Sequence, residues 1–229
     1  MNKNVYEKNV EEFGFSTAHK IIISQVNSGQ KVLEVGSSSG YLTKVLNEKS
    51  AVVDILEVEK EPFEKAKKFA RNSYFGSIED LKVQEKITEK YDVIICADVL
   101  EHLVNPDSVL EFLKTKLNKD GIFLVSIPNV AYWGMRVHLM FSGDFSYHES
   151  GLMDRTHLRF YSLNNFKDLL KKKGYTVMEI YPAEVRVPLE NSLKKLPVLG
   201  KVIVTFMKGF FAKNFQNLSL YHYVVKARI

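Results

Sequence analysis

Two things are scarce in this chain of 229 residues: cysteine, which occurs once, and long apolar runs. A single cysteine excludes a disulfide within the chain and is compatible with a reducing cytoplasm. Cys96 lies inside an apolar strand-like run, so we expect it to be a buried small side chain and not a nucleophile. The opening residues, Met-Asn-Lys-Asn-Val-Tyr-Glu-Lys, contain no apolar core of a signal peptide. We therefore expect a cytoplasmic protein.

The apolar residues are dispersed. The run around Leu196–Ala212 is too short, and too interrupted by lysines, to span a bilayer. No internal repeat or low-complexity tract is evident. The hydrophobic share of 45% still suffices for a full core, and the length predicts one large domain.

Charge is distributed unevenly along the chain. Residues 186–229 contain eight lysines and arginines and one acid, Glu190, which gives +7. The remaining residues contain 24 basic and 26 acidic side chains, or −2, so the net charge of +5 comes from the C-terminal fifth. This asymmetry predicts an anionic partner near that end.

Residues 32–40, Val-Leu-Glu-Val-Gly-Ser-Ser-Ser-Gly, are the most informative stretch. An apolar strand ends in an acidic residue and continues into a turn of small residues that opens a helix. A second apolar run ends at Glu57, twenty-three residues after Glu34. This order is typical of a βαβ nucleotide site, in which the turn lets the cofactor approach the backbone and the second carboxylate binds the ribose hydroxyls.

The residues of the turn narrow the choice of cofactor. A dinucleotide fingerprint has glycine at the first, third and sixth positions, which here are Gly36, Ser38 and Tyr41. Tyrosine at the sixth position would obstruct close packing. A P-loop needs Gly-Lys-Ser/Thr at the helix start, where this chain has Gly40-Tyr41-Leu42. An adenosine cofactor without a pyrophosphate remains, and S-adenosylmethionine fits.

Four segments extend this pattern, in an order and spacing that match a known family: 31–40, 56–66, 91–103 and 121–129. On these segments the chain resembles the class I S-adenosylmethionine-dependent methyltransferases, over roughly residues 31–173. It is most similar to the small-molecule O-methyltransferase branch, which includes ubiquinone-type enzymes and relatives from bacterial polysaccharide gene clusters. The family usually has glycine where this chain has Ser38, and serine lacks the freedom of glycine at positive φ.

The expected fold is α/β, a doubly wound, mostly parallel seven-stranded sheet of the Rossmann-like methyltransferase type, with a helical insertion before the last strand. Strands are predicted near 31–35, 51–57, 91–97, 121–127, 175–183 and 219–228, and helices near 5–26, 40–48, 60–71, 106–117, 163–173 and 189–213. We expect one methyltransferase domain over 1–229, divided into an N-terminal helical cap (1–30), a cofactor-binding core (31–128), a substrate lid (129–161) and an amphipathic helical insertion (189–213).

The cofactor-binding residues are predicted at the strand ends and by the resemblance. They are Glu34, Gly36, Ser38, Gly40, Glu57, Val58, Ser77, Ile78 and Asp98. Glu34 either orients the loop or reaches the amino group of the cofactor. The resemblance implies that Ser77 and Ile78 flank the adenine. Asp98 either faces the substrate or caps the following turn.

Methyl transfer from a sulfonium is an in-line displacement, and a hydroxyl nucleophile also benefits from a base. His157 is the leading candidate for that base, with Asp98 and His102 as further catalytic candidates; a structural role for His157 is the alternative. In related enzymes a Glu and a His at the turn of Glu101 and His102 can bind a divalent metal. No comparable second ligand pair follows here, so we expect His102 to support the site and no metal to be bound, with a metal ligand as the alternative.

The segment 129–161 mixes aromatic residues, His, Arg and Gly with little periodicity, which is typical of a functional loop. We interpret it as the substrate lid. Its predicted substrate-binding residues are Tyr132, Trp133, Arg136, Asp154, Arg155 and Arg159. The guanidinium groups suit a phosphate or carboxylate, and the aromatic rings suit a sugar or a planar ring.

The insertion 189–213 carries an apolar stripe at i, i+3, i+4 spacing, with Lys194, Lys201 and Lys208 on another face. A helix packed on its own domain or on a second subunit, as in a homodimer, is one interpretation. The other is an interfacial helix whose lysines meet anionic lipid, which would make the protein peripheral at the inner membrane face.

These features predict an S-adenosylmethionine-dependent methyltransferase that methylates an oxygen of a small-molecule, saccharide or lipid-linked glycan acceptor and releases S-adenosylhomocysteine. No nucleic-acid module is recognisable, so we expect no nucleic-acid partner. One alternative is a non-catalytic S-adenosylmethionine-binding assembly or regulatory subunit. Another is a nucleotide-dependent oxidoreductase, against which Tyr41 and the lack of a Tyr-x-x-x-Lys pair argue.

Overall fold

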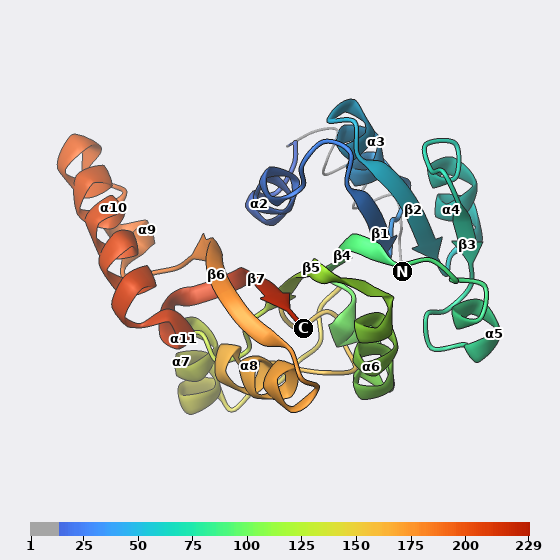
Figure 1. Cartoon of the computed structure of the whole chain (residues 1–229). Helices are drawn as coiled ribbons and strands as arrows, with labels where there is room; N and C mark the ends of the chain where they lie inside the picture. Colours follow the sequence, from blue (N-terminus) through green and yellow to red (C-terminus); the bar gives the residue numbers. More distant parts are fainter. Residues whose placement is uncertain (1–13) are drawn as a thin grey trace.

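A computed structural model of the chain describes residues 14–229 (Figure 1). The part of the expected leading helix before Gly14 lies outside the described residues. Seven strands form one sheet in the order β3-β2-β1-β4-β5-β7-β6. Their bounds are β1 (Lys31–Val35), β2 (Val52–Glu57), β3 (Ser73–Phe75), β4 (Tyr91–Ala97), β5 (Leu117–Pro128), β6 (Thr176–Val185) and β7 (Leu220–Arg228).

The sheet is parallel except at one strand. β7 pairs antiparallel with both β5 and β6, while every other pairing is parallel. The strand order reverses between β1 and β4, and in sheets of this kind ligands bind at the carboxyl ends of the strands beside that reversal. The doubly wound, mostly parallel seven-stranded sheet expected from the sequence is confirmed.

Helices cover both faces of the sheet. Their bounds are α2 (Thr17–Gln25), α3 (Tyr41–Glu48), α4 (Lys60–Ala66), α5 (Leu81–Gln84), α6 (Pro106–Lys116), α7 (Trp133–Ser142), α8 (Leu163–Lys172), α9 (Glu190–Leu193), α10 (Pro197–Asn214) and α11 (Gln216–Ser219), with a 3₁₀ turn, η1, at Leu100–His102. Ile22 of α2 and Leu42 of α3 are buried in the core on one face. Leu110 of α6 and Phe166 of α8 are buried in the core on the other. Cys96, on β4, is buried between them.

The lid differs from the expectation of an irregular loop, because residues Trp133–Ser142 form α7. The apolar side chains of its second half, such as Met140 and Phe141, are exposed and give no amphipathic pattern that would reveal a helix. β3 and α5 were also missed. They are three and four residues long, too short for periodicity to register.

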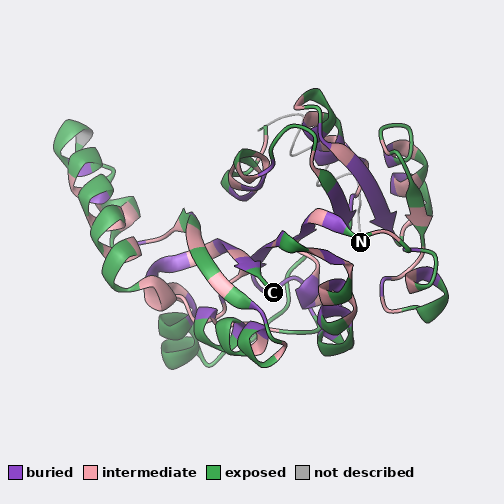
Figure 2. Cartoon of the chain, viewed as in Figure 1, coloured by how far each residue is buried: buried purple, intermediate pink, exposed green. Residues whose placement is uncertain are grey.

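The insertion is also not one helix over 189–213. α9 ends at Leu193, and α10 begins at Pro197, whose missing backbone N–H is tolerated only in the first turn of a helix. Lys194 and Lys208 both form ion pairs with Glu190, at 2.6 and 2.8 Å, and the pair with Lys208 joins α9 to α10. α10 extends away from the sheet, and Figure 2 shows it exposed along most of its length. Only part of α10 contacts its own domain: Val204 is buried and Ala212 packs against the core, while most of the helix is exposed.

Candidate active site

The loop between β1 and α3 is shaped by two glycines with positive φ. Gly36 has φ +74° and Gly40 has φ +82°. A Cβ on Gly40 would lie 2.8 Å from the Cα of Ala66, so this glycine lets α3 approach α4. Ser38 has φ +49°, the left-handed conformation that glycine would adopt without strain. The departure from the family pattern at this position is therefore accommodated by a strained serine.

Glu57, at the end of β2, closes the loop. Its Oε2 accepts a hydrogen bond from the backbone N–H of Ser38 and its Oε1 accepts one from Glu59, both at 2.8 Å. Burial raises the pKa of Glu57, and these hydrogen bonds oppose the shift. A carboxylate offers about four acceptor positions, so two remain for the hydroxyls of a ribose. The carboxylate of Glu57 can therefore bind the ribose of the adenosine cofactor that the spacing predicts.

Glu34 faces inward. Its Oε2 accepts a hydrogen bond of 2.6 Å from the hydroxyl of Thr43 on α3. Burial raises the pKa of Glu34 to about 8, and the bond from Thr43 opposes the shift. Of the two roles expected for Glu34, this contact favours orienting the loop and its helix.

The residues predicted to lie beside the adenine have different surroundings in the structure. Val58 follows β2 and its side chain is 57% exposed, an apolar surface beside Glu57 that a base could cover. Ile78 is instead buried in the core. Ser77 accepts a hydrogen bond from the backbone of Glu79, whose carboxylate in turn accepts hydrogen bonds from Val104 and Asn105. The adenine roles of Ser77 and Ile78 stay predictions.

Asp98, which follows β4, faces a histidine that the sequence analysis missed. Its Oδ1 lies 2.7 Å from Nε2 of His222, on β7, and accepts a hydrogen bond of 2.8 Å from the hydroxyl of Ser126. Asp98 has φ +53°, an uncommon conformation for a residue other than glycine. Burial opposes ionisation, but the attraction of His222 and these hydrogen bonds hold the pKa of Asp98 below its ordinary value. Of the two roles left open for Asp98, this geometry favours facing the site over capping a helix.

Glu101, His102 and His157 are brought together from two segments. One ligand atom from each lies within 4.8 Å of the others, an arrangement that admits a cation. Both carboxylate oxygens of Glu101 are buried without a hydrogen-bond partner among the described residues. Burial, followed by the charge of Asp98, raises the pKa of Glu101 well above its ordinary value.

The two histidines are also anchored to the backbone. Nδ1 of His102 lies 3.1 Å from the carbonyl oxygen of Thr156, and Nδ1 of His157 lies 3.0 Å from that of Leu152. Their rings meet edge to face, with centroids 4.8 Å apart. Burial lowers the pKa of His157. These contacts support the structural alternative for His157, and its catalytic role stays a prediction.

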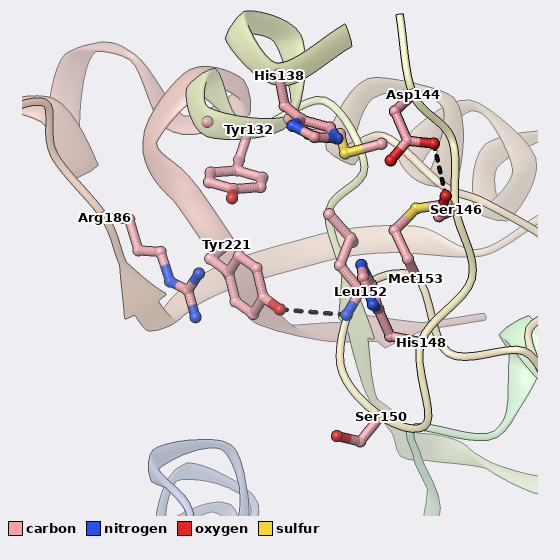
Figure 3. A pocket seen from close by; sticks show the side chains of 12 residues that line it. Tyr132, His138, Asp144, Ser146, His148, Ser150, Leu152, Met153, Arg186 and Tyr221 are labelled. Atoms are coloured by element: carbon pink, nitrogen blue, oxygen red, sulfur yellow. Dashed lines mark hydrogen bonds between the residues drawn. The ribbon is translucent and has the colours of Figure 1, made fainter. Parts of the chain in front are cut away.

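A cavity of about 400 Å³ opens between α7, the following loop and β7 (Figure 3). Its wall contains Tyr132, Tyr221 and Arg186. The Arg186 guanidinium carbon lies 3.5 Å from the centroid of the Tyr221 ring and 5.8 Å from that of Tyr132. The hydroxyl of Tyr221 accepts a hydrogen bond of 3.1 Å from the backbone of Leu152, which fixes the ring against the loop. Aromatic faces and a guanidinium can bind a ring that carries an anionic group.

The predicted substrate-binding residues divide into two groups. Tyr132 lines the cavity, and Trp133 donates a hydrogen bond of 2.9 Å to the carbonyl of Arg186. The remaining four do not line it: Arg136, Asp154, Arg155 and Arg159. Arg155 forms an ion pair with Glu149, Arg159 donates to the carbonyl of Val104, and Asp154 accepts from Thr156. Their contacts are with the protein itself, so their role at the acceptor stays a prediction.

Three residues of this site were not predicted from the sequence: Arg186, Tyr221 and His222. All three lie far from the family segments, near the ends of the last two strands of the sheet. Only the antiparallel insertion of β7 beside β5 brings them to the carboxyl edge of β4. The one available signal was that Tyr221 and His222 are polar aromatic residues at the start of a predicted apolar strand.

Comparison with known proteins agrees with this geometry. A family model described as "Methyltransferase domain" matches residues 6–180, more than half of the chain. The ubiquinone biosynthesis O-methyltransferase of Haemophilus ducreyi is 33% identical over 109 residues, covering 44% of this chain and 46% of that protein. The Vibrio campbellii protein of the same name is 35% identical over 107 residues, covering 44% and 45%. The chain therefore matches just under half the length of these relatives.

Solved structures show the same fold. A SAM-dependent methyltransferase from Archaeoglobus fulgidus superposes with a TM-score of 0.65 at 12% identity, covering 98% of this chain and 99% of that one. The magnesium protoporphyrin IX methyltransferase of Synechocystis, solved with bound S-adenosylhomocysteine, has a TM-score of 0.57 at 13% identity, covering 98% and 84%. The family match, the shared fold and the loop closed by Glu57 lead to one conclusion. The chain belongs to the class I S-adenosylmethionine-dependent methyltransferase family, with small-molecule O-methyltransferases among its relatives.

Proposed function

We propose that the protein transfers the methyl group of S-adenosylmethionine to a hydroxyl oxygen of a small-molecule acceptor held in the cavity beside Tyr221. The observation that carries this proposal is the position of the two sites. The cofactor loop follows β1, and the cavity borders the start of β7. Asp98 follows β4, a strand that lies between β1 and β7 in the sheet. When bound, S-adenosylmethionine supplies an electrophilic methyl group on a sulfonium.

The residues of the chain then bind and align. The loop of Gly36, Ser38 and Gly40 holds the cofactor against the backbone, and Glu57 accepts hydrogen bonds from its ribose. Tyr132 and Tyr221 hold the acceptor ring, and Arg186 pairs with an anionic group on it. Methyl transfer is in line, so most of the rate enhancement comes from holding these two molecules in register. We also propose the division into an N-terminal cap, a cofactor core, a lid and a C-terminal insertion.

A saccharide or lipid-linked acceptor is supported by the C-terminal insertion. Within residues 14–229, no helix combines the length and apolar character needed to cross a bilayer. α10 nevertheless exposes Val198, Val202 and Phe206. An open cavity of about 450 Å³ at its base has three basic residues in its lining, Arg136, Lys167 and Lys213, and no acidic one. We propose that α10 lies on an anionic membrane surface and brings the lid to a lipid-linked acceptor.

The test of transfer is a panel of acceptors with S-adenosylmethionine, read by release of S-adenosylhomocysteine. The panel contains catechols, phenolic acids, sugar phosphates and undecaprenyl-pyrophosphate-linked sugars. Turnover with one class, reduced by Arg186→Gln, is the expected result. Tight binding of both S-adenosylmethionine and S-adenosylhomocysteine with no turnover on any acceptor would favour the non-catalytic subunit instead.

The membrane contact is tested separately, by sedimentation with vesicles of phosphatidylcholine with and without 30% phosphatidylglycerol. Binding to the anionic vesicles alone, weakened in high salt, is the expected result. A second copy of the chain covering α10 would instead appear as a dimer by light scattering that Phe206→Ser dissociates.

A further inference from the structure

His222, on β7, contacts Asp98 at the carboxyl end of β4, although no sequence motif drew attention to it. Its Nε2 is bonded to Asp98, and its Nδ1 makes no hydrogen bond to any other residue between 14 and 229. We propose that His222 is the general base of the methyl transfer and that Asp98 is the residue that positions it. This proposal rests on the proposed function.

The partner of Nε2 decides which nitrogen can act. Asp98 is an ionised carboxylate and only accepts hydrogen bonds, so Nε2 of His222 must carry a proton to donate. In the neutral imidazole the lone pair then lies on Nδ1, which is the nitrogen without a partner. A carboxylate that fixes the tautomer of a histidine and stabilises its charged form is the arrangement that serves hydrolases with a catalytic triad.

The dyad lies beside the cofactor loop, at the same edge of the sheet as the acceptor cavity. Val35 of β1 pairs with Cys96 of β4, so the residues that follow these strands are neighbours at the same edge. A Cβ on Gly36 would lie 2.7 Å from Cγ2 of Val99, which shows how closely the turn of Asp98 approaches the loop. Tyr221, which precedes His222 on β7, lines the cavity from the opposite face of the sheet, so the cavity and the dyad approach each other at the start of β7.

The backbone of Asp98 is held in a costly conformation that aims its carboxylate at β7. A φ of +53° disfavours any residue with a Cβ, and such conformations collect at functional sites. Ser126 holds it twice: its hydroxyl oxygen accepts from the Asp98 N–H at 3.1 Å, and the hydroxyl donates to Oδ1 at 2.8 Å. A side chain that served only to satisfy His222 would not require this strain.

Three charged or titratable groups face His222: Asp98 from β4, Glu184 from β6 and His19 from α2. Burial lowers the pKa of His222, but the two carboxylates more than compensate and raise it above its ordinary value. Burial lowers the pKa of His19, and repulsion from His222 adds to this shift, so a proton is favoured on His222 over His19. The site therefore stabilises the imidazolium that proton uptake creates.

The chemical step balances with these groups. The acceptor oxygen forms a bond to the methyl carbon, and the carbon–sulfur bond breaks with its electron pair left on sulfur. The hydroxyl proton moves to Nδ1 of His222. The side chain of His222 is 17% exposed, so the proton can pass to water before the next turnover. His157 is less suited, because its ring is buried beside His102 and Phe160.

The experiment combines turnover with a measurement on the protein without ligands. His222→Gln and Asp98→Asn are assayed with the acceptor that the panel identifies, and the binding of S-adenosylmethionine is measured by calorimetry. Turnover should fall by about 10²- to 10⁴-fold in His222→Gln and at least tenfold in Asp98→Asn, with the cofactor affinity of His222→Gln unchanged within threefold. Asp120→Asn, an exposed acid on β5, is the control.

NMR titration of the histidine ring protons supplies the second readout. The pKa of His222 should fall by about one unit or more in Asp98→Asn, and by less in Glu184→Gln, which leaves the hydrogen bond intact. In the wild type, kcat should rise with pH through the pKa measured for His222. Turnover of His222→Gln within threefold of wild type, or no change of the His222 pKa in Asp98→Asn, would overturn the proposal. A wild type that methylates no acceptor would instead overturn the proposed function and this inference with it.

Discussion

The cofactor half of the molecule (β1, β2 and α3) and its C-terminal arm (α10) differ in how their side chains are packed. Around β1, β2 and α3 nearly every polar group is engaged: Glu57 closes the loop, Glu34 binds Thr43, and Gly40 lets two helices touch. In α10, by contrast, Val198, Leu199 and Phe206 are exposed. The cofactor half must hold a small ligand within a fraction of an ångström, whereas the arm has only to present a surface. Changes of the same chemical kind should therefore have very different effects in the two regions.

Removal of the Glu57 carboxylate should have the largest effect. Glu57→Ala loses two hydrogen bonds to the loop backbone and those to the ribose, each worth about 1.5–3 kcal/mol when the acceptor is charged. We expect affinity for S-adenosylmethionine to fall by about 100-fold or more in calorimetric titration. Glu61→Gln, on the exposed side of α4, is the matched control and should bind normally. Equal affinity of Glu57→Ala and the control would show that the loop, not the carboxylate, holds the cofactor.

Two glycine-to-alanine substitutions, one in each region, test this comparison. In Gly40→Ala the new Cβ meets the backbone of Ala66 at a residue with φ +82°, so unfolding should become easier by about 1–3 kcal/mol. In Gly209→Ala, on α10, the Cβ meets nothing within 4 Å, and helix propensity should stabilise the protein by up to about 1 kcal/mol. Urea denaturation measures both. Shifts of the same sign would contradict the comparison.

The buried Glu34 predicts a dependence of stability on pH. Its pKa is raised to about 8 from an ordinary 4.5, so the neutral form is favoured in the folded state. This contribution is fully present below pH 4.5 and is lost as the pH rises through 8. Glu34→Gln imitates the neutral form and should unfold less readily than wild type at pH 8, by on the order of 4 kcal/mol, and equally at pH 4.5. A constant difference between the two proteins across this range would argue against a protonated Glu34.

The smallest effect on stability is expected in the arm. Phe206 is 73% exposed, so Phe206→Ser should change the free energy of unfolding by no more than about 0.5 kcal/mol. The same substitution should weaken binding to anionic vesicles about tenfold or more, because burial of a phenylalanine in lipid contributes about 1.5–3 kcal/mol. Phe123→Ser, in the core on β5, is the contrast and should unfold the protein.

The cofactor half of the site was predictable from the sequence, whereas the part that depends on β7 was not. Gly36, Glu57 and Asp98 were predicted because they follow strands whose apolar runs and spacing are legible in the sequence. His222 and Arg186 were not, because their place depends on the antiparallel entry of β7, which no local pattern specifies. Pro197 indicates the start of α10, although one continuous helix over 189–213 was predicted. α7 was hidden because its second half has no buried face.

The pairing of Asp98 with His222, which are 124 positions apart in the sequence, also bears on how the protein is made. β6 is synthesised before β7 but pairs with the sheet only through it. At about 5–20 residues per second, roughly ten seconds separate the synthesis of the two members of the dyad. During that interval the cofactor loop and its strands can already assemble, while the edge of β5 that later pairs with β7 has no partner strand. Biosynthesis thus yields a nucleoside-binding half first, and the reactive centre is completed only when β7 enters the gap.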